Sequence, residues 1–374
     1  MATPEITGYR AVRAAARDHE AYSSDLQGDR DVRDYRQLPL EADPPRHDRF
    51  RVALEPYFNR TAIEPHVPAF TDLAHRLIDD ISANGGGELV HDLALPYVMG
   101  CLAIIYDRPQ DVDEWISWGP DVWTAEAYQK GEITSESLDL GRNRDFSVPS
   151  QRSGRVLEEY LTRVFDTAQQ REKDGTDEAD VWDHVQRLQI EGEPLSRAEK
   201  FGIANVLLAG GRDTVIKMTT GLTWHLINTP ADRIYLTQEP EARPRAFAEL
   251  ARYLSPLPKI ERMVPERRGD GPEPDRESYV LLNWASANHD QSVWPDADRI
   301  DIRRERNPHV AFGFGRHSCL GVNITEHEIN AYLAALLERW PEWVLDGEPD
   351  ISWVDEHGTP FLDRFDRVPV RVQA

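Results

Sequence analysis

The stretch HVAFGFGRHSCLG, residues 309–321, places three glycines, two phenylalanines and two histidines around Cys319, one of only two cysteines in the chain. Apolar residues recur at helical spacing directly after it, which predicts a helix from 322 to 340. Backbone N–H groups and the dipole at a helix N-terminus lower the pKa of a thiol and favour the thiolate. Gly313 and Gly315 allow the backbone to turn tightly and to approach a flat ligand. A lone thiolate cradled by backbone amides is suited to be the axial ligand of a haem iron.

Most isolated cysteines are instead small buried hydrophobic residues, and the short pattern FGxG alone is weak evidence against that role. Cys101 fits that role, because it lies in the apolar run YVMGCLAII, residues 97–105. Two cysteines give neither a disulfide framework nor a zinc site. The full pattern FGxGxHxCxG over residues 312–321 is far more specific, and it favours the ligand role for Cys319.

A helical pattern runs from the capping box Ser196-x-x-Glu199 to about residue 228. A helix of roughly 32 residues would be about 48 Å long and would cross the whole molecule. We therefore predict one long helix over this range.

The middle of this helix carries LLAGGRDT, residues 207–214. Gly210, its glycine neighbour and the acid–alcohol pair Asp213-Thr214 are poor helix formers, each costing up to about 1 kcal/mol relative to alanine. A local rule broken inside an element indicates a functional site, although two glycines also allow close helix packing. Arg212 lies roughly 160° from Thr214 around the helix, so we expect it to be structural or a partner of Asp213.

Two further pairs are spaced for hydrogen bonding on helices. In DPPRHDRFR, residues 43–51, two prolines precede a helix from which His47 and Arg51 project on one face. Such donors suit the binding of carboxylates, although a solvated basic face is the alternative. Glu249 and Arg252 are three residues apart and would ordinarily form a surface pair worth a few tenths of a kcal/mol.

These motifs, in this order, resemble the cytochrome P-450 family of haem-thiolate monooxygenases, from about residue 9 to the C-terminus. The family has the same cysteine loop, an Asp-Pro-Pro-x-His-x-x-x-Arg segment, an oxygen-binding groove, a Glu-x-x-Arg pair and a segment like LPKIERM, residues 257–263. The resemblance implies a mainly α (α+β) fold with a small β-region, and we expect residues 1–374 to form a single domain. We also expect the family's N-terminal strands to be missing or shortened, a strand at 279–282, a hairpin over 361–372 and a loop at 131–153.

The resemblance also implies haem b as the cofactor, with Cys319 as its axial ligand. The residues that it places against the haem are His47, Arg51 and Arg262 at the propionates and Phe312, His317 and Gly321 in the cysteine loop. The residues that it makes a buried structural group are Glu249, Arg252 and Arg304. The residues that it assigns to oxygen chemistry are Gly210 or Gly211, which leaves space, Thr214, which bonds dioxygen, and Asp213, which relays protons. The residues that it assigns to the substrate pocket are Val206, Ala209 and Ile260.

The activity implied is insertion of one oxygen atom from O2 into a small to medium hydrophobic substrate. The sequence contains no dinucleotide fingerprint and no iron–sulfur cysteines, so we expect electrons from a ferredoxin or flavodoxin with its NAD(P)H-dependent reductase. We predict a basic docking patch formed by Arg46, Arg49, Arg303, Arg304, Arg306 and Arg316. The alternatives are a peroxide-driven haem-thiolate oxygenase or isomerase, which would not need Asp213 and Thr214, and a non-catalytic haem sensor.

The composition excludes other classes of function. A net charge of -23 disfavours nucleic-acid binding. No apolar run is long enough to span a bilayer, and no signal peptide opens the chain. We therefore expect a cytoplasmic protein without a membrane segment.

Overall fold

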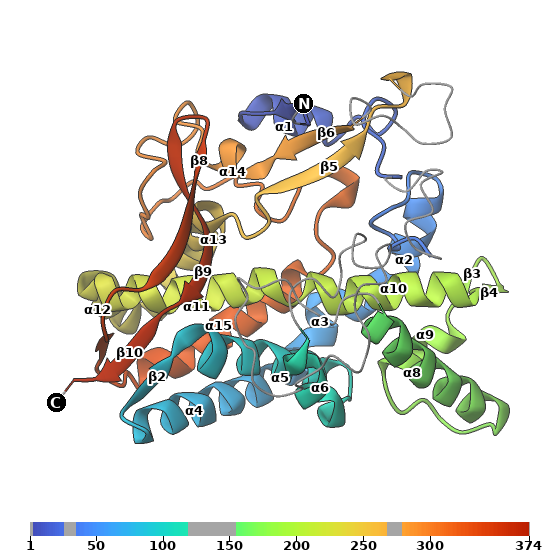
Figure 1. Cartoon of the computed structure of the whole chain (residues 1–374), viewed down its shortest axis with the longest axis horizontal. Coiled ribbons are helices and arrows are strands. Elements are labelled where there is room, and N and C mark those ends of the chain that lie inside the picture. Colours follow the sequence, from blue (N-terminus) through green and yellow to red (C-terminus); the bar gives the residue numbers. More distant parts are fainter. Residues whose placement is uncertain (1–2, 26–34, 119–154, 268–278, 374) are drawn as a thin grey trace.

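A computed structural model describes residues 3–25, 35–118, 155–267 and 279–373, and the predicted loop at 131–153 lies outside this part. Helices make up most of the described chain, and the small sheets lie at separate places around them (Figure 1). The α-helices are α1 (Tyr9–Ala15), α2 (Arg46–Phe58), α3 (Arg60–Ile63), α4 (Val67–Ala83), α5 (Leu95–Ile105), α6 (Val112–Ser117), α8 (Arg155–Lys173), α9 (Val181–Arg187), α10 (Arg197–Gly210), α11 (Asp213–Asn228), α12 (Pro230–Gln238), α13 (Arg243–Leu254), α14 (Trp284–Asn288) and α15 (Val322–Glu338).

In the described part of the chain, the strands form two sheets of three strands and two of two strands. They are β1 (Glu5–Ile6), β2 (Gly86–Glu88), β3 (Gln189–Ile190), β4 (Glu193–Pro194), β5 (Lys259–Met263), β6 (Tyr279–Asn283), β7 (Trp343–Leu345), β8 (Asp350–Glu356), β9 (Thr359–Arg367) and β10 (Pro369–Val372). The sheet β1-β6-β5 contains the strand predicted at 279–282, and its N-terminal member β1 has only two residues.

The predicted hairpin over 361–372 is wrong in its pairing. β9 pairs antiparallel with the preceding strand β8, and β10 instead lies between β2 and β7. Extended chain is present here, but strand partners depend on contacts that are remote in sequence.

The long helix predicted from 196 to 228 is broken in the middle. The capping box at Ser196 is present, but α10 ends at Gly210, and α11 begins at Asp213. Between them, Arg212 has φ −102° and ψ −85°, which is not helical. The break frees backbone carbonyls at the end of α10, and the hydroxyl of Tyr106 donates to the carbonyl of Leu207 at 2.9 Å. The glycines of this motif therefore mark a true interruption.

Helix α15 forms the centre of the core. It packs against α4, α13 and α11, and its residues Ile329, Leu333 and Leu336 have no exposed surface. The predicted helix from 322 to 340 is confirmed, and α15 ends at Glu338, ahead of a proline.

One acidic side chain lies inside this core. Glu328 on α15 is fully buried, and neither carboxyl oxygen has a hydrogen-bond partner among the described residues. Burial raises the pKa of Glu328 well above its ordinary value, which favours the neutral carboxyl group in the folded protein.

Because the folded protein keeps this proton while the unfolded chain loses it above a pKa of about 4.3, wild-type stability should fall with rising pH. We expect Glu328→Gln to remove this term. As the pH rises from the unfolded-state pKa of Glu328 to its folded-state pKa, the difference in unfolding free energy between Glu328→Gln and wild type should grow in favour of the variant. The growth should be up to about 1.4 kcal/mol per pH unit. Urea unfolding from pH 5 to 8 measures this. Glu338→Gln, at the exposed end of the same helix, is the control, and parallel curves for wild type and Glu328→Gln would contradict the assignment.

Candidate active site

The cysteine loop is a tight structure that is held by its own backbone. The N–H of Cys319 donates to the carbonyl of Phe312 at 2.7 Å, and Gly313 and Gly315 have φ of 71° and 79°. A Cβ atom at Gly315 would lie 2.9 Å from the carbonyl oxygen of Ala16, so any larger residue there would clash with the chain after α1. The loop leads directly into α15, whose N-cap is Gly321.

The thiol of Cys319 has two properties that together indicate that it lies in the wall of a cavity. The side chain is exposed, yet desolvation by surrounding protein raises the pKa of the thiol. The N–H of Gly321 and the charge of Arg51 act in the opposite direction but are outweighed. The predicted lowering of this pKa by the helix terminus is therefore wrong for the free thiol. Coordination to a metal ion deprotonates a thiol outright, so burial does not prevent ligation.

Four hydrogen-bond donors gather beside this loop: His47, Arg51, Arg262 and His317. The rings of His47 and His317 lie 4.2 Å apart between centroids, and both Nε2 atoms are buried without a partner among the described residues. Arg262 is 5% exposed, and its guanidinium donates to the carbonyl of Glu261 at 2.8 Å. Buried polar atoms without partners are costly, so the two histidine nitrogens indicate that this group accommodates a partner from outside the chain.

The charges of this group point to an anionic acceptor. Burial lowers the pKa of Arg262 to about 10. Burial, with the positive charges of Arg262, His47 and Arg51, lowers the pKa of His317 to about 3. Arg51 is fixed by hydrogen bonds to the carbonyl oxygens of Ser318 and Arg316. Two carboxylates placed here would satisfy the free donors and offset the excess positive charge.

The junction of α10 and α11 brings the acid–alcohol pair beside open space. A Cβ atom at Gly210 would meet nothing within 4 Å. The hydroxyl of Thr214 donates to the carbonyl of Gly210 at 3.2 Å. Asp213 is 43% exposed and pairs with the buried Arg212 at 2.7 Å, and Arg212 also donates to the carbonyl of Trp118 at 2.5 Å. The expectation that Arg212 is a partner of Asp213 is confirmed.

The residues predicted for the substrate pocket are all partly exposed: Val206 and Ala209 on α10 and Ile260 on β5. Phe312, predicted to lie against the haem, is also partly exposed, and its ring lies 5.9 Å from that of Phe247 on α13.

The predicted structural group is present: Glu249, Arg252 and Arg304 lie together. The side chains of Glu249 and Arg252 have no solvent contact. Arg252 donates to both carboxylate oxygens of Glu249 at 2.9 and 2.7 Å, and Arg304 donates to one at 3.2 Å. Sequence reasoning missed Asn307, whose amide donates to Glu249 at 3.0 Å, and the N–H of Asp301, which donates at 2.9 Å. Only their position close to Arg304 in the sequence, just before the cysteine loop, could have indicated them.

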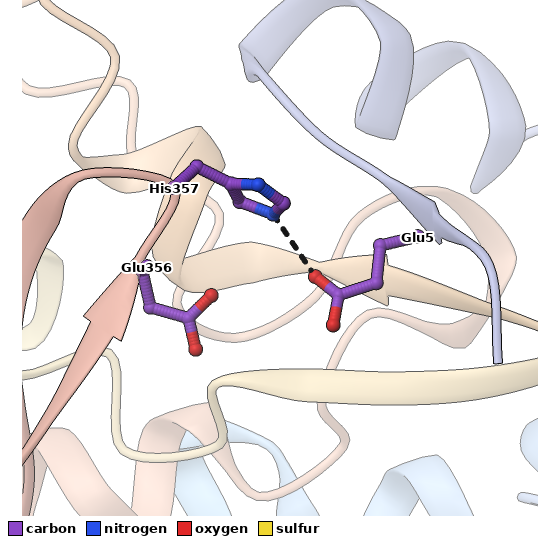
Figure 2. Close-up of side chains that lie close together, drawn as sticks. All are labelled: Glu5, Glu356 and His357. Carbon is purple, nitrogen blue, oxygen red and sulfur yellow. Dashed lines mark hydrogen bonds and ion pairs between the residues drawn. The ribbon is translucent and has the colours of Figure 1, made fainter. Parts of the chain in front are cut away.

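A second cluster has side chains of the metal-binding type. Glu5, Glu356 and His357 lie close together on β1 and at the tip of the β8–β9 hairpin (Figure 2). The ammonium of Lys259 bridges both carboxylates at 2.8 and 2.9 Å, and the amide of Asn283 donates to both at 2.9 and 2.7 Å. The cluster therefore already contains its cation, and it fastens the N-terminal strand and the hairpin to the sheet.

Comparison with known proteins identifies the family. A sequence model of the family described as Cytochrome P450 matches residues 244–351. A Bacillus subtilis (strain 168) protein named Cytochrome P450 is 26% identical over 314 residues, which cover 83% of this chain and 71% of that protein. The solved structure described as a carbohydrate active P450 superposes with a TM-score of 0.78 at 26% identity, covering 98% of this chain and 91% of that one. This chain belongs to the cytochrome P450 family.

Other relatives agree with this P450's chemistry. Cytochrome P450 monooxygenase PikC of Streptomyces venezuelae is 27% identical over 343 residues, which cover 89% of this chain and 75% of PikC. This P450 is a monooxygenase, and its cofactor is haem b. The accessible thiol, the two unpartnered histidine nitrogens and the two arginines beside them fit that group, which carries one metal ion and two carboxylates. Within the described ranges, no helix is long and apolar enough to cross a bilayer.

The predicted basic docking patch is largely neutralised. Five of its six arginines form ion pairs, all with carboxylates of this chain: Arg46–Glu199, Arg49–Glu191, Arg303–Asp232, Arg304–Glu249 and Arg316–Asp48. Counting arginines along the sequence could not reveal these pairs, because every partner comes from a different segment or another turn of helix. Most of this set therefore adds little net positive charge to the surface.

Proposed function

We propose that this P450 inserts one oxygen atom of O2 into a C–H bond of a small to medium hydrophobic substrate. The balanced reaction is RH + O2 + 2 electrons + 2 protons giving ROH + H2O, with the electrons supplied by a separate redox protein. The observation that carries the proposal is the group of buried, unpartnered donors beside the accessible thiol of Cys319.

Relatives and pocket residues support this substrate class. A Streptomyces fradiae relative, 29% identical over 312 residues, is named 20-oxo-5-O-mycaminosyltylactone 23-monooxygenase, and a Mycobacterium tuberculosis relative is named Steroid C26-monooxygenase. Val206, Ala209 and Ile260 would offer apolar contacts to such a substrate.

Each residue of the site has a role in this proposal. Cys319 would hold the iron, while His47, Arg51, Arg262 and His317 would hold the two propionates. When bound, haem supplies the centre at which O2 is activated and one oxygen atom is transferred. The protein fixes the position of this centre and controls the delivery of protons to it.

Asp213 and Thr214 would deliver those protons. Asp213 is partly exposed, so its carboxylate can exchange protons with solvent, and the ion pair with Arg212 holds it at the helix junction. The hydroxyl of Thr214 can accept a proton at Oγ1 while donating its own, and it is already oriented by the carbonyl of Gly210. Gly210 would leave room for O2, since no atom lies where its Cβ would be.

Thr214→Ala tests the proposal. We expect NAD(P)H consumption to continue with a redox partner and a converted substrate, while product formation falls by about 10²-fold, the lower end of the effect of a positioned proton donor. The ratio of product formed to NAD(P)H consumed measures this uncoupling.

The control is Thr237→Ala on α12, whose hydroxyl makes the same bond to a carbonyl four residues earlier. A Thr214→Ala protein with unchanged coupling would favour the peroxide-driven or isomerase alternative, because that chemistry needs no proton relay. Absence of substrate-dependent electron use in the wild type would favour a haem sensor.

A further inference from the structure

A cavity of about 170 Å³ lies where three parts of the chain meet: the segment after β1, helix α14 and the turn of the β8–β9 hairpin. We call it the α14 cavity, and its wall includes Thr7, Gly8, Ser286, His289, Thr359 and Phe361. None of its wall residues belongs to the group beside Cys319, to the junction of α10 and α11 or to the predicted substrate pocket. The α14 cavity is therefore a place distinct from the candidate active site.

His289 gives the α14 cavity a hydrogen-bond acceptor. Its Nδ1 lies 2.9 Å from the carbonyl oxygen of Ala285, which can only accept, so Nδ1 carries the hydrogen. Nε2 has no hydrogen-bond partner among the residues that the structure describes, and it is not sealed off from solvent. Burial, together with the positive charges of Arg252 and Lys217, lowers the pKa of His289 to about 4. The imidazole is therefore neutral at pH 7, and the lone pair of Nε2 is available to a ligand.

Other side chains of the wall are apolar or already have partners. Phe361 is 2% exposed, and its ring meets that of His289 edge-on, with the centroids 5.7 Å apart. The hydroxyl of Ser286 already makes two hydrogen bonds to backbone groups. Glu356 and His357 also line the cavity, and both are held in the cluster that Figure 2 shows. The cavity therefore combines an aromatic ring with an acceptor that has no partner.

The size and charge of the α14 cavity restrict the class of ligand. An engineered cavity of about 150 Å³ binds benzene, so this one has room for a single aromatic ring with a small substituent. An anion is disfavoured, because the wall contains the carboxylate of Glu356 and neither a lysine nor an arginine. A cation is disfavoured as well, because the charges of Arg252 and Lys217 that lower the pKa of His289 also repel it. A neutral ring with one strong hydrogen-bond donor meets both conditions.

We propose that the α14 cavity binds a small phenol, whose hydroxyl group donates to Nε2 of His289 and whose ring packs against Phe361. The inference goes beyond the proposed function and does not depend on it. The ring of Phe361 also meets Lys217 of α11, whose Nζ lies 4.6 Å from the ring centroid. A bound phenol is therefore one side chain away from the helix that carries Thr214.

The experiment uses the haem-loaded protein with a bulky azole on its iron, which keeps small ligands out of the haem pocket. The probes are para-fluorophenol and para-fluorotoluene, which share the ring but differ in the donor, and fluorine NMR titration gives both affinities. His289→Phe keeps a ring and removes Nε2, while Thr359→Phe fills the cavity from the hairpin. The control is His66→Phe, because the ring of His66 also lies beside a phenylalanine, with its centroid 6.3 Å from that of Phe70, but does not line the cavity.

We expect wild type to bind para-fluorophenol about tenfold more tightly than para-fluorotoluene, near the upper end of what one hydrogen bond contributes. In His289→Phe the two affinities should differ by less than about twofold, because neither ligand then has an acceptor. Thr359→Phe should lose both ligands, since the added ring occupies their space. His66→Phe should behave as wild type.

Four results would overturn the proposal. Equal affinities of the two probes in wild type, or an unchanged preference in His289→Phe, would show that the hydroxyl group does not meet Nε2. Probes that bind only without the azole would lie in the haem pocket, and a wild type that binds neither probe would have a cavity for water only. If His289→Phe does not fold, retention of both ligands by Thr359→Phe would overturn the proposal by the same titration.

Discussion

Replacement of Cys319 by serine is expected to abolish the strongly red-shifted Soret band of the reduced protein under carbon monoxide, together with product formation. A serine hydroxyl is a much weaker electron donor than a thiolate, and electron donation by the thiolate assists cleavage of the O–O bond. The loss of activity should exceed the roughly 100-fold effect of removing a residue that only supports a metal ligand. Difference spectroscopy and product analysis measure the two effects.

The matched control is Cys101→Ala, because Cys101 is the other cysteine, is fully buried and packs in α5. That variant should keep the red-shifted band even if it loses some stability. A Cys319→Ser protein with an unchanged band would show that another group binds the iron, and the reading of the loop at 309–321 would be wrong.

Glu249→Gln is expected to be the most destabilising single substitution of a charged residue described above. The carboxylate of Glu249 has no solvent contact and accepts hydrogen bonds from Arg252, Arg304, Asn307 and the N–H of Asp301. A neutral amide would leave the buried guanidinium of Arg252 without its counter-charge. Breaking a buried pair from one side typically costs about 3–5 kcal/mol.

Denaturant unfolding followed by circular dichroism measures this loss, and the Soret band shows whether haem leaves at the same point. The control is Glu326→Gln, which removes the ion pair with Arg60, a residue that is 58% exposed at its side chain. That exposed pair should contribute about 1 kcal/mol or less. Equal losses for the two variants would show that the group around Glu249 does not hold the cysteine loop in place.

The sequence allowed prediction of those features that depend on neighbouring residues. The capping box at Ser196 and the helix after Cys319 follow from local spacing, and both are present. The three residues around Glu249 could be predicted only through the family resemblance, because a pair three residues apart on a helix looks like an ordinary surface pair.

Features that depend on distant residues could not be predicted. The ion pair of Arg49 needs Glu191, and the position of β10 needs β2, which lies more than 280 residues earlier. The predicted lowering of the pKa of Cys319 was wrong for a similar reason. The position of the thiol at a helix terminus can be read from nearby residues, but its desolvation comes from the whole surrounding protein. Arg13, on α1, and Arg17, two residues beyond its end, both stack on Phe314, and their four-residue spacing was the one local signal for this.

The break between α10 and α11 also creates an electric field in the interior. Each helix carries about half an elementary charge at its ends, negative at the C-terminus and positive at the N-terminus. An unbroken helix would have its ends only at the surface, but here two opposite ends meet around Gly210 and Asp213. Thr214 spans them, because it belongs to the positive end and donates its hydrogen to a carbonyl of the negative one. The backbone therefore polarises this hydroxyl in a fixed direction before any ligand is bound.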